Sequence, residues 1–169
     1  MLKKILLAVA VALPMFGVSA QTVKIGIVDT STIMQAMPES TEAQNKLAES
    51  SKKYEEQFGN LQVELERLYK ELQEMKQDEL QAIKDRKLRE FQEQQQKLET
   101  FQQQAQQDLG KMQQELMAPI VSKIRTAVEA VGKEGNFSFI QNYEPSLTLY
   151  YGAPTVDITP QVKAKLGLK

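Results

Sequence analysis

Residues 40–116 carry apolar side chains at intervals of three and four on a charged, glutamine-rich background, with no proline and two glycines. In the first half of this stretch the intervals alternate strictly between four and three, which is the a/d spacing of a coiled-coil seam. The apolar residues of this outgoing half are Tyr54, Phe58, Leu61, Leu65, Leu68, Leu72 and Met75.

The second half carries a similar stripe that is interrupted by one extra four-residue step at Ala105. A step of this kind locally unwinds a left-handed supercoil. The stretch is too long for one helix of a compact domain, so we predict that residues 46–117 form an antiparallel helical hairpin, an arm, with its tip near residues 78–87. The apolar residues of the returning half are Leu98, Phe101, Leu109, Met112 and Leu116.

The flanking segments have the patterns of short strands and of a helix with a broad apolar face. Residues 23–28 and 137–140 alternate and are rich in β-branched and aromatic types, which predicts strands, and residues 147–151 are the expected hairpin partner of the second. Residues 120–131 suit a helix packed on a sheet. Thr159 is the expected N-cap of a final short helix.

The predicted fold is therefore α+β, with residues 21–45 and 118–169 forming a small body below the arm. A body of about 75 residues has a marginal core, and three strands leave open edges. We therefore expect strands of several chains to join in one shared β structure. The residues expected at this interface are Val23, Ile25, Ile27, Phe139 and Leu149.

Residues 1–20 have the organisation of a signal peptide. Lys3 and Lys4 precede an apolar run over residues 5–18, and a small-x-small pattern ends at Ala20. The run is shorter than the roughly 20 residues that span a bilayer as a helix. We predict export and cleavage after Ala20; the alternative is an uncleaved membrane anchor.

Composition narrows the chemistry that this chain can perform. The net charge is −1, and removal of Lys3 and Lys4 makes it −3, so no broad basic field exists to attract nucleic acid. The chain has no cysteine and no histidine, which excludes zinc sites built from them, Ser-His-Asp triads and Cys-His dyads. No constellation suggests other catalysis. We expect no enzymatic activity, no cofactor and no metal.

Apolar residues off the seam or near the tip are candidates for weak, adaptable contacts to another chain, although each alone also suits ordinary packing. The Met residues would add flexibility to such a surface. These candidates are Val63, Leu80, Ile83, Leu88 and Phe91.

A small basic cluster lies at the presumed tip, diluted by Asp85 and Glu90. It suits either a solvated tip or a contact to an acidic segment or an anionic lipid head group. The cluster consists of Lys84, Arg86, Lys87 and Arg89.

Taken in order, these features resemble the Skp (OmpH) family of periplasmic chaperones. The features are a signal peptide, a strand ending in Ile25-Gly26-Ile27-Val28-Asp29, a long charged hairpin, the strand Phe137-Ser138-Phe139-Ile140, and Asp157-Ile158-Thr159 before a short helix. The resemblance covers essentially the whole mature chain. It implies a periplasmic homotrimer with a common β-barrel body and three arms around a cavity.

The resemblance also implies a function: family members hold unfolded outer-membrane proteins in that cavity without ATP until they reach the outer membrane. Well-studied members are strongly basic, whereas this chain is slightly acidic, which argues against strong electrostatic capture of clients. We expect peripheral membrane contact or none.

Two other functions suit the same pattern. An exported coiled-coil spacer or adaptor would also have a long hairpin, but it would dock one folded partner through a defined patch. A helix lying on a membrane surface fits less well, because the apolar stripe is narrow and its charges are mixed rather than basic.

Overall fold

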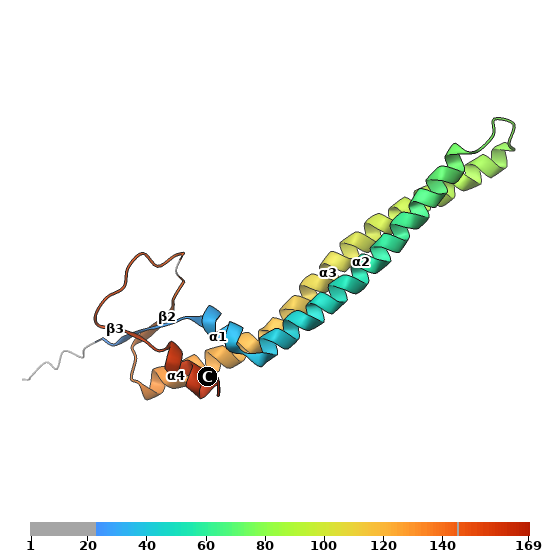
Figure 1. The fold of residues 1–169 in the computed structure, drawn as a ribbon. Helices are drawn as coiled ribbons and strands as arrows, with labels where there is room; N and C mark the ends of the chain where they lie inside the picture. Colours follow the sequence, from blue (N-terminus) through green and yellow to red (C-terminus); the bar gives the residue numbers. More distant parts are fainter. Residues whose placement is uncertain (1–22, 145) are drawn as a thin grey trace, which may run out of the picture.

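The computed structural model describes residues 23–144 and 146–169. A long helical hairpin projects from a small body that contains a three-stranded sheet (Figure 1). The predicted α+β fold with a long helical arm is therefore confirmed. The predicted signal peptide, its cleavage site after Ala20 and the turn at Pro145 lie outside the described residues.

The arm consists of α2 (Pro38–Gln73) and the first part of α3 (Gln81–Glu134), which run side by side in opposite directions (Figure 1). Pro38 occupies the first helical position of α2, where its missing N–H costs nothing. With 36 residues, α2 is about 54 Å long at 1.5 Å per residue.

The chain reverses direction between the two helices, over residues 74–80. This turn overlaps the predicted tip only at residues 78–80, and residues 81–87 belong to the first turns of α3. The turn comes earlier than predicted because of the register in which the two helices pair. The Glu71–Lys87 ion pair and the contact between the Tyr69 and Phe91 rings have midpoints at residues 79 and 80, before the middle of the predicted tip at residues 78–87.

At the foot of the arm, α3 continues into the body without a break at Pro119. Pro119 is exposed, so the Glu115 carbonyl that loses its helical partner faces solvent rather than a dry core. Beyond it the helix buries a broader apolar stripe, and Gly135 caps its end by donating its N–H to the Val131 carbonyl at 2.9 Å. Gly132 lies inside α3.

The sheet is entirely parallel and has the order β2-β1-β3, with β1 (Ile25–Val28) between β2 (Phe139–Asn142) and β3 (Thr155–Asp157). The predicted hairpin is therefore wrong: residues 147–151 form no strand, and β3 comes later in the chain. Residues 147–151 have strong β-propensity, but β3 takes the free edge of β1 in a run of only three residues. A strand that short carries no readable alternation.

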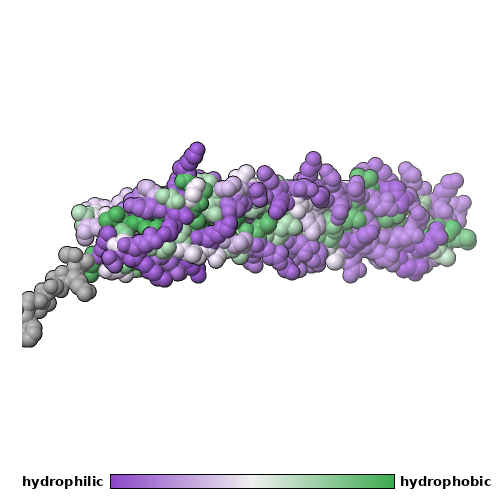
Figure 2. Space-filling view, turned by 90° about the horizontal axis from the view of Figure 1, so that it is seen from below, coloured by the Kyte–Doolittle hydropathy of each residue, from purple (hydrophilic) through white to green (hydrophobic). Residues whose placement is uncertain are grey.

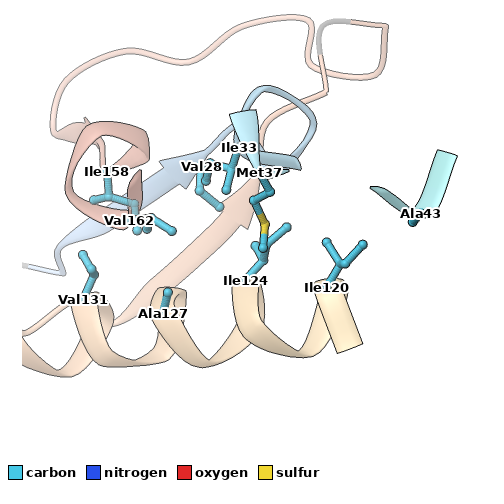
Figure 3. Packing of buried hydrophobic residues seen from close by; sticks show 10 residues of the cluster. All are labelled: Val28, Ile33, Met37, Ala43, Ile120, Ile124, Ala127, Val131, Ile158 and Val162. Carbon is cyan, nitrogen blue, oxygen red and sulfur yellow. The ribbon is translucent and has the colours of Figure 1, made fainter. Parts of the chain in front are cut away.

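The core of the body brings β1 and α1, which are adjacent in sequence, together with the distant helices α3 and α4. Ile33 of α1 (Thr30–Ala36) and Val162 of α4 (Thr159–Lys165) are fully buried against the apolar stripe of α3 and the inner side of β1 (Figure 3). The ten buried residues of this cluster are Val28, Ile33, Met37, Ala43, Ile120, Ile124, Ala127, Val131, Ile158 and Val162.

The N-terminal and C-terminal segments of the body are joined by a hydrogen bond from the Asp29 backbone to the Thr159 side chain. Thr159 is not the N-cap that the sequence predicted; α4 begins at Thr159 itself, and Ile158 is the N-cap. The Thr159 hydroxyl instead accepts the Asp29 backbone N–H at 2.9 Å. Asp29 in turn caps α1, since its carboxylate accepts the Thr32 N–H at 2.8 Å.

Candidate functional site

The predicted seam residues of the arm are all at least partly buried, and all but Met75, which lies in the turn after α2, belong to α2 or α3. Leu68 is buried, with 5% of its surface exposed, and the others are half-buried in the single chain. The half-buried members are Tyr54, Phe58, Leu61, Leu65, Leu72, Met75, Leu98, Phe101, Leu109, Met112 and Leu116.

Polar contacts supplement this seam on both sides. Tyr54 packs against Phe101 with ring centroids 5.9 Å apart, and its hydroxyl donates to the Asp108 carboxylate at 3.0 Å. That hydrogen bond raises the pKa of the Tyr54 hydroxyl above its ordinary value of 10.0. Nearer the tip, the Gln94 amide donates to the Leu61 carbonyl at 3.2 Å. Both contacts fix the register of the two helices.

The lower half of the arm is less well filled. A hollow of about 200 Å³ opens between the helices, where Ala105 lies in the seam between Phe101 and Leu109. Ser51 and Leu109 also line a second hollow of about 590 Å³ nearer the body. The sequence contained the signal for this groove, because the extra four-residue step brings a small residue into the seam, but sequence reasoning did not identify it.

The five predicted apolar contact residues do not form one patch of exposed surface. Val63, Leu80 and Leu88 are exposed by 68%, 71% and 48%, whereas Ile83 and Phe91 are half-buried. The Phe91 ring packs against Tyr69 with centroids 6.1 Å apart and the ring planes tilted by 37°, so it belongs to the helix contact near the tip.

The predicted basic cluster is largely compensated by neighbouring acids. Lys87 pairs with Glu71 of the opposite helix and with Glu90, and Arg86 lies 3.6 Å from the same Glu90. Lys84 donates to the Gln77 carbonyl of the tip at 2.9 Å. Of the four predicted cations, Arg89 alone has no such contact among the described residues. This arrangement is typical of a solvated helix surface.

The sheet has one face turned away from the helices, and several predicted interface residues belong to it. In β1, Ile27 is buried and Ile25 is half-buried. Phe139 of β2, which pairs with Ile25, is 56% exposed. Val23 is 59% exposed, and Leu149, on the segment that follows β2, is fully exposed. The single chain therefore leaves apolar side chains beside two open sheet edges.

Within residues 23–144 and 146–169, no three acidic side chains converge in a way that could hold a metal ion. None of the helices described there is long and apolar enough to cross a membrane.

Comparison with known proteins agrees with this architecture. The family model for outer membrane proteins of the OmpH-like type matches residues 24–166, so the chain belongs to the OmpH-like family. The crystal structure of a candidate outer membrane chaperone (OmpH-like) from Caulobacter crescentus CB15 has the same fold. Its TM-score is 0.69 at 15% identity, over 86% of this chain and 84% of that one. No curated protein matched the chain.

Proposed function

We propose that this protein is an ATP-independent periplasmic holdase that binds unfolded outer-membrane β-barrel proteins, prevents their aggregation and aids their delivery to the outer membrane. The observation that carries the proposal is the arm itself: two long helices with a half-buried apolar seam project from a small body. Such a surface offers many weak contacts without a fixed interface, which is what binding an unfolded chain requires. Membership of the OmpH-like family supports the same function.

The active form in this proposal is a homotrimer whose three arms surround the client. The open sheet edges and the exposed side chains of Val23, Phe139 and Leu149 support an assembly through the body. Three arms that contact one client act at high effective concentration, so weak individual contacts add up to stable retention. Neither catalysis nor a cofactor takes part.

The proposed location is the periplasm, after cleavage of the signal peptide behind Ala20. Mass spectrometry of the protein from the periplasmic fraction checks this directly. We expect a mature chain that begins at Gln21, and a chain that still carries residues 1–20 would contradict the proposal.

The function is tested by diluting a urea-unfolded outer-membrane β-barrel protein into buffer with and without this protein, and by following turbidity. We expect the client to stay soluble without ATP, and a natively folded protein to remain unbound in a parallel pull-down. The rival function, an exported spacer or adaptor, predicts the opposite pattern: the client precipitates and one folded partner is retained.

A further inference from the structure

The groove along the lower half of the arm is lined very differently from the rest of the arm surface. Its floor is apolar, with Tyr54, Phe58, Phe101 and Leu109 among the lining residues. The two hollows share Ser51, Gln106 and Leu109 and therefore form one continuous groove between the helices. Figure 2 shows apolar patches of this kind along the middle of an otherwise hydrophilic arm.

The rim of the groove is almost free of charge. Glu55 is the one side chain among its lining residues that is charged at neutral pH, and the Ser51 hydroxyl lies 3.3 Å from its carboxylate. The other polar lining residues are the four amides Gln44, Gln102, Gln106 and Gln113. Elsewhere the arm is dense with ion pairs, such as Arg67 with Glu64 and Lys70 with Glu66.

The four rim amides are available to a ligand. Gln94 and Gln104 use their amides on the Leu61 carbonyl and on Asp108, but no such hydrogen bond holds the rim glutamines within the described chain. Each primary amide offers two donors and an acceptor, which match the N–H and C=O groups of a peptide backbone. Gln102 and Gln106 lie four residues apart, about 6 Å along the helix axis, close to the repeat of roughly 6.6 Å on one side of an extended strand.

We propose that this groove is the site at which the arm holds an extended, uncharged client segment with alternating apolar side chains, as in a transmembrane β-strand. The occupant follows from charge complementarity, because a neutral rim fits a neutral segment. Between Phe101 and Gln113 the groove extends about 18 Å, enough for five or six extended residues at roughly 3.3 Å each. This inference deepens the proposed holdase function and rests on it.

Two matched pairs of variants test the groove in the full mature protein. Gln106→Glu adds a charge to the rim, and Ala105→Leu fills the floor. Gln107→Glu makes the same change as Gln106→Glu, and Gln107→Leu introduces the same side chain as Ala105→Leu, at a neighbouring exposed glutamine that does not line the groove. Circular dichroism verifies that all four variants keep the helicity of the wild type.

The probe is a fluorescent ten-residue peptide with capped ends that alternates Leu or Tyr with Ser or Thr, and its Kd is measured by fluorescence anisotropy. We expect Gln106→Glu and Ala105→Leu to weaken binding at least about fivefold, and the two Gln107 variants to bind within about twofold of the wild type. A peptide with Lys and Glu at the polar positions should bind more weakly than the neutral one.

Failure of the groove and failure of the holdase function give different results. If the wild type keeps a β-barrel client soluble but binds the neutral peptide equally well in all variants, or not at all, the groove is refuted and the holdase function stands. If the wild type binds the peptide at the groove but lets the client precipitate, the groove stands and the holdase function is refuted.

Discussion

The body and the arm bury their apolar residues to very different degrees. The body cluster contains ten buried residues from segments that are more than a hundred positions apart, such as Val28 and Val162. Along most of the arm, by contrast, only Leu68 is buried and the rest of the seam is half-exposed. The body therefore fixes one conformation through long-range packing, whereas the arm keeps apolar surface within reach of another chain.

The largest expected difference between the two regions is in the stability lost when a large apolar side chain is truncated to alanine. Ile33→Ala in the body should lower the free energy of unfolding by about 2–5 kcal/mol, because Ile33 is fully buried and leaves a cavity. Leu61→Ala removes the same number of carbon atoms from the half-buried seam and should cost clearly less. Urea denaturation at one protein concentration compares them, and equal losses would contradict the distinction.

The partly buried hydrogen bond between the Asp29 N–H and the Thr159 hydroxyl gives the next largest effect. Thr159→Val leaves the Asp29 N–H without its acceptor in a region where Thr159 is only 9% exposed, and should cost about 1–3 kcal/mol. Thr126→Val on exposed α3 surface is the matched control, since its hydroxyl contacts only the Ser122 carbonyl. We expect the control to change stability by less than about 0.5 kcal/mol, and thermal unfolding of both variants measures the difference.

Replacing glycine by alanine should change stability in opposite directions in the two regions, lowering it in the body and raising it in the arm. A Cβ on Gly26 in β1 would lie 3.1 Å from Ile140 Cγ1 and 3.2 Å from Phe137 Cδ1, so Gly26→Ala should destabilise the body. A Cβ on Gly59 or Gly110 would meet nothing within 4 Å. Gly59→Ala and Gly110→Ala should each stabilise the arm by about 0.5–1 kcal/mol. Thermal unfolding measures these changes. A higher Tm for Gly26→Ala, or a lower Tm for Gly59→Ala and Gly110→Ala, would contradict this packing.

The smallest effect concerns the cap of α1 and depends on pH. Hydrogen bonds from the Thr32 hydroxyl and backbone N–H hold the pKa of the Asp29 carboxyl below its ordinary value of 3.8. The stabilisation is therefore complete above the unfolded-state pKa and is lost as the pH falls through the lower folded-state value. Asn at this position caps a helix without titrating.

The stability of the wild type relative to Asp29→Asn should accordingly fall between pH 5 and pH 2, by less than about 1 kcal/mol at this exposed site. Denaturant titrations of both proteins across this pH range measure the difference. If the wild type instead became more stable relative to Asp29→Asn as the pH falls, the assignment of the Asp29 carboxylate as the cap of α1 would be contradicted.

The arm was predictable from the sequence because its signal is local. The seam residues from Tyr54 to Met75 all follow the same alternating spacing, no proline interrupts it, and Gly59 lies off the seam. The position of the turn was predicted a few residues too late, since the hairpin register depends on contacts such as Tyr69 with Phe91 that spacing alone does not fix.

The body was harder to predict because its contacts are not local. The run at residues 147–151 has the composition of a strand, yet β3 forms at Thr155–Asp157, where β1 offers a free edge. The Thr159 hydroxyl was assigned to its own helix, but it bonds Asp29, 130 positions away. The groove forms where Ala105 lies opposite Tyr54 and Phe58 of α2. The sequence of either helix alone does not show this juxtaposition.

The central claim is that the body assembles the protein while the arms hold the client, and static light scattering tests it most directly. The native mass of the mature wild type is measured with and without a urea-unfolded β-barrel client, and compared with that of Leu65→Asp/Leu68→Asp, whose charges should open the seam. We predict a three-chain mass for both proteins and one soluble client bound only by the wild type. A variant that still binds the client, or a wild type that is not trimeric, would contradict the account.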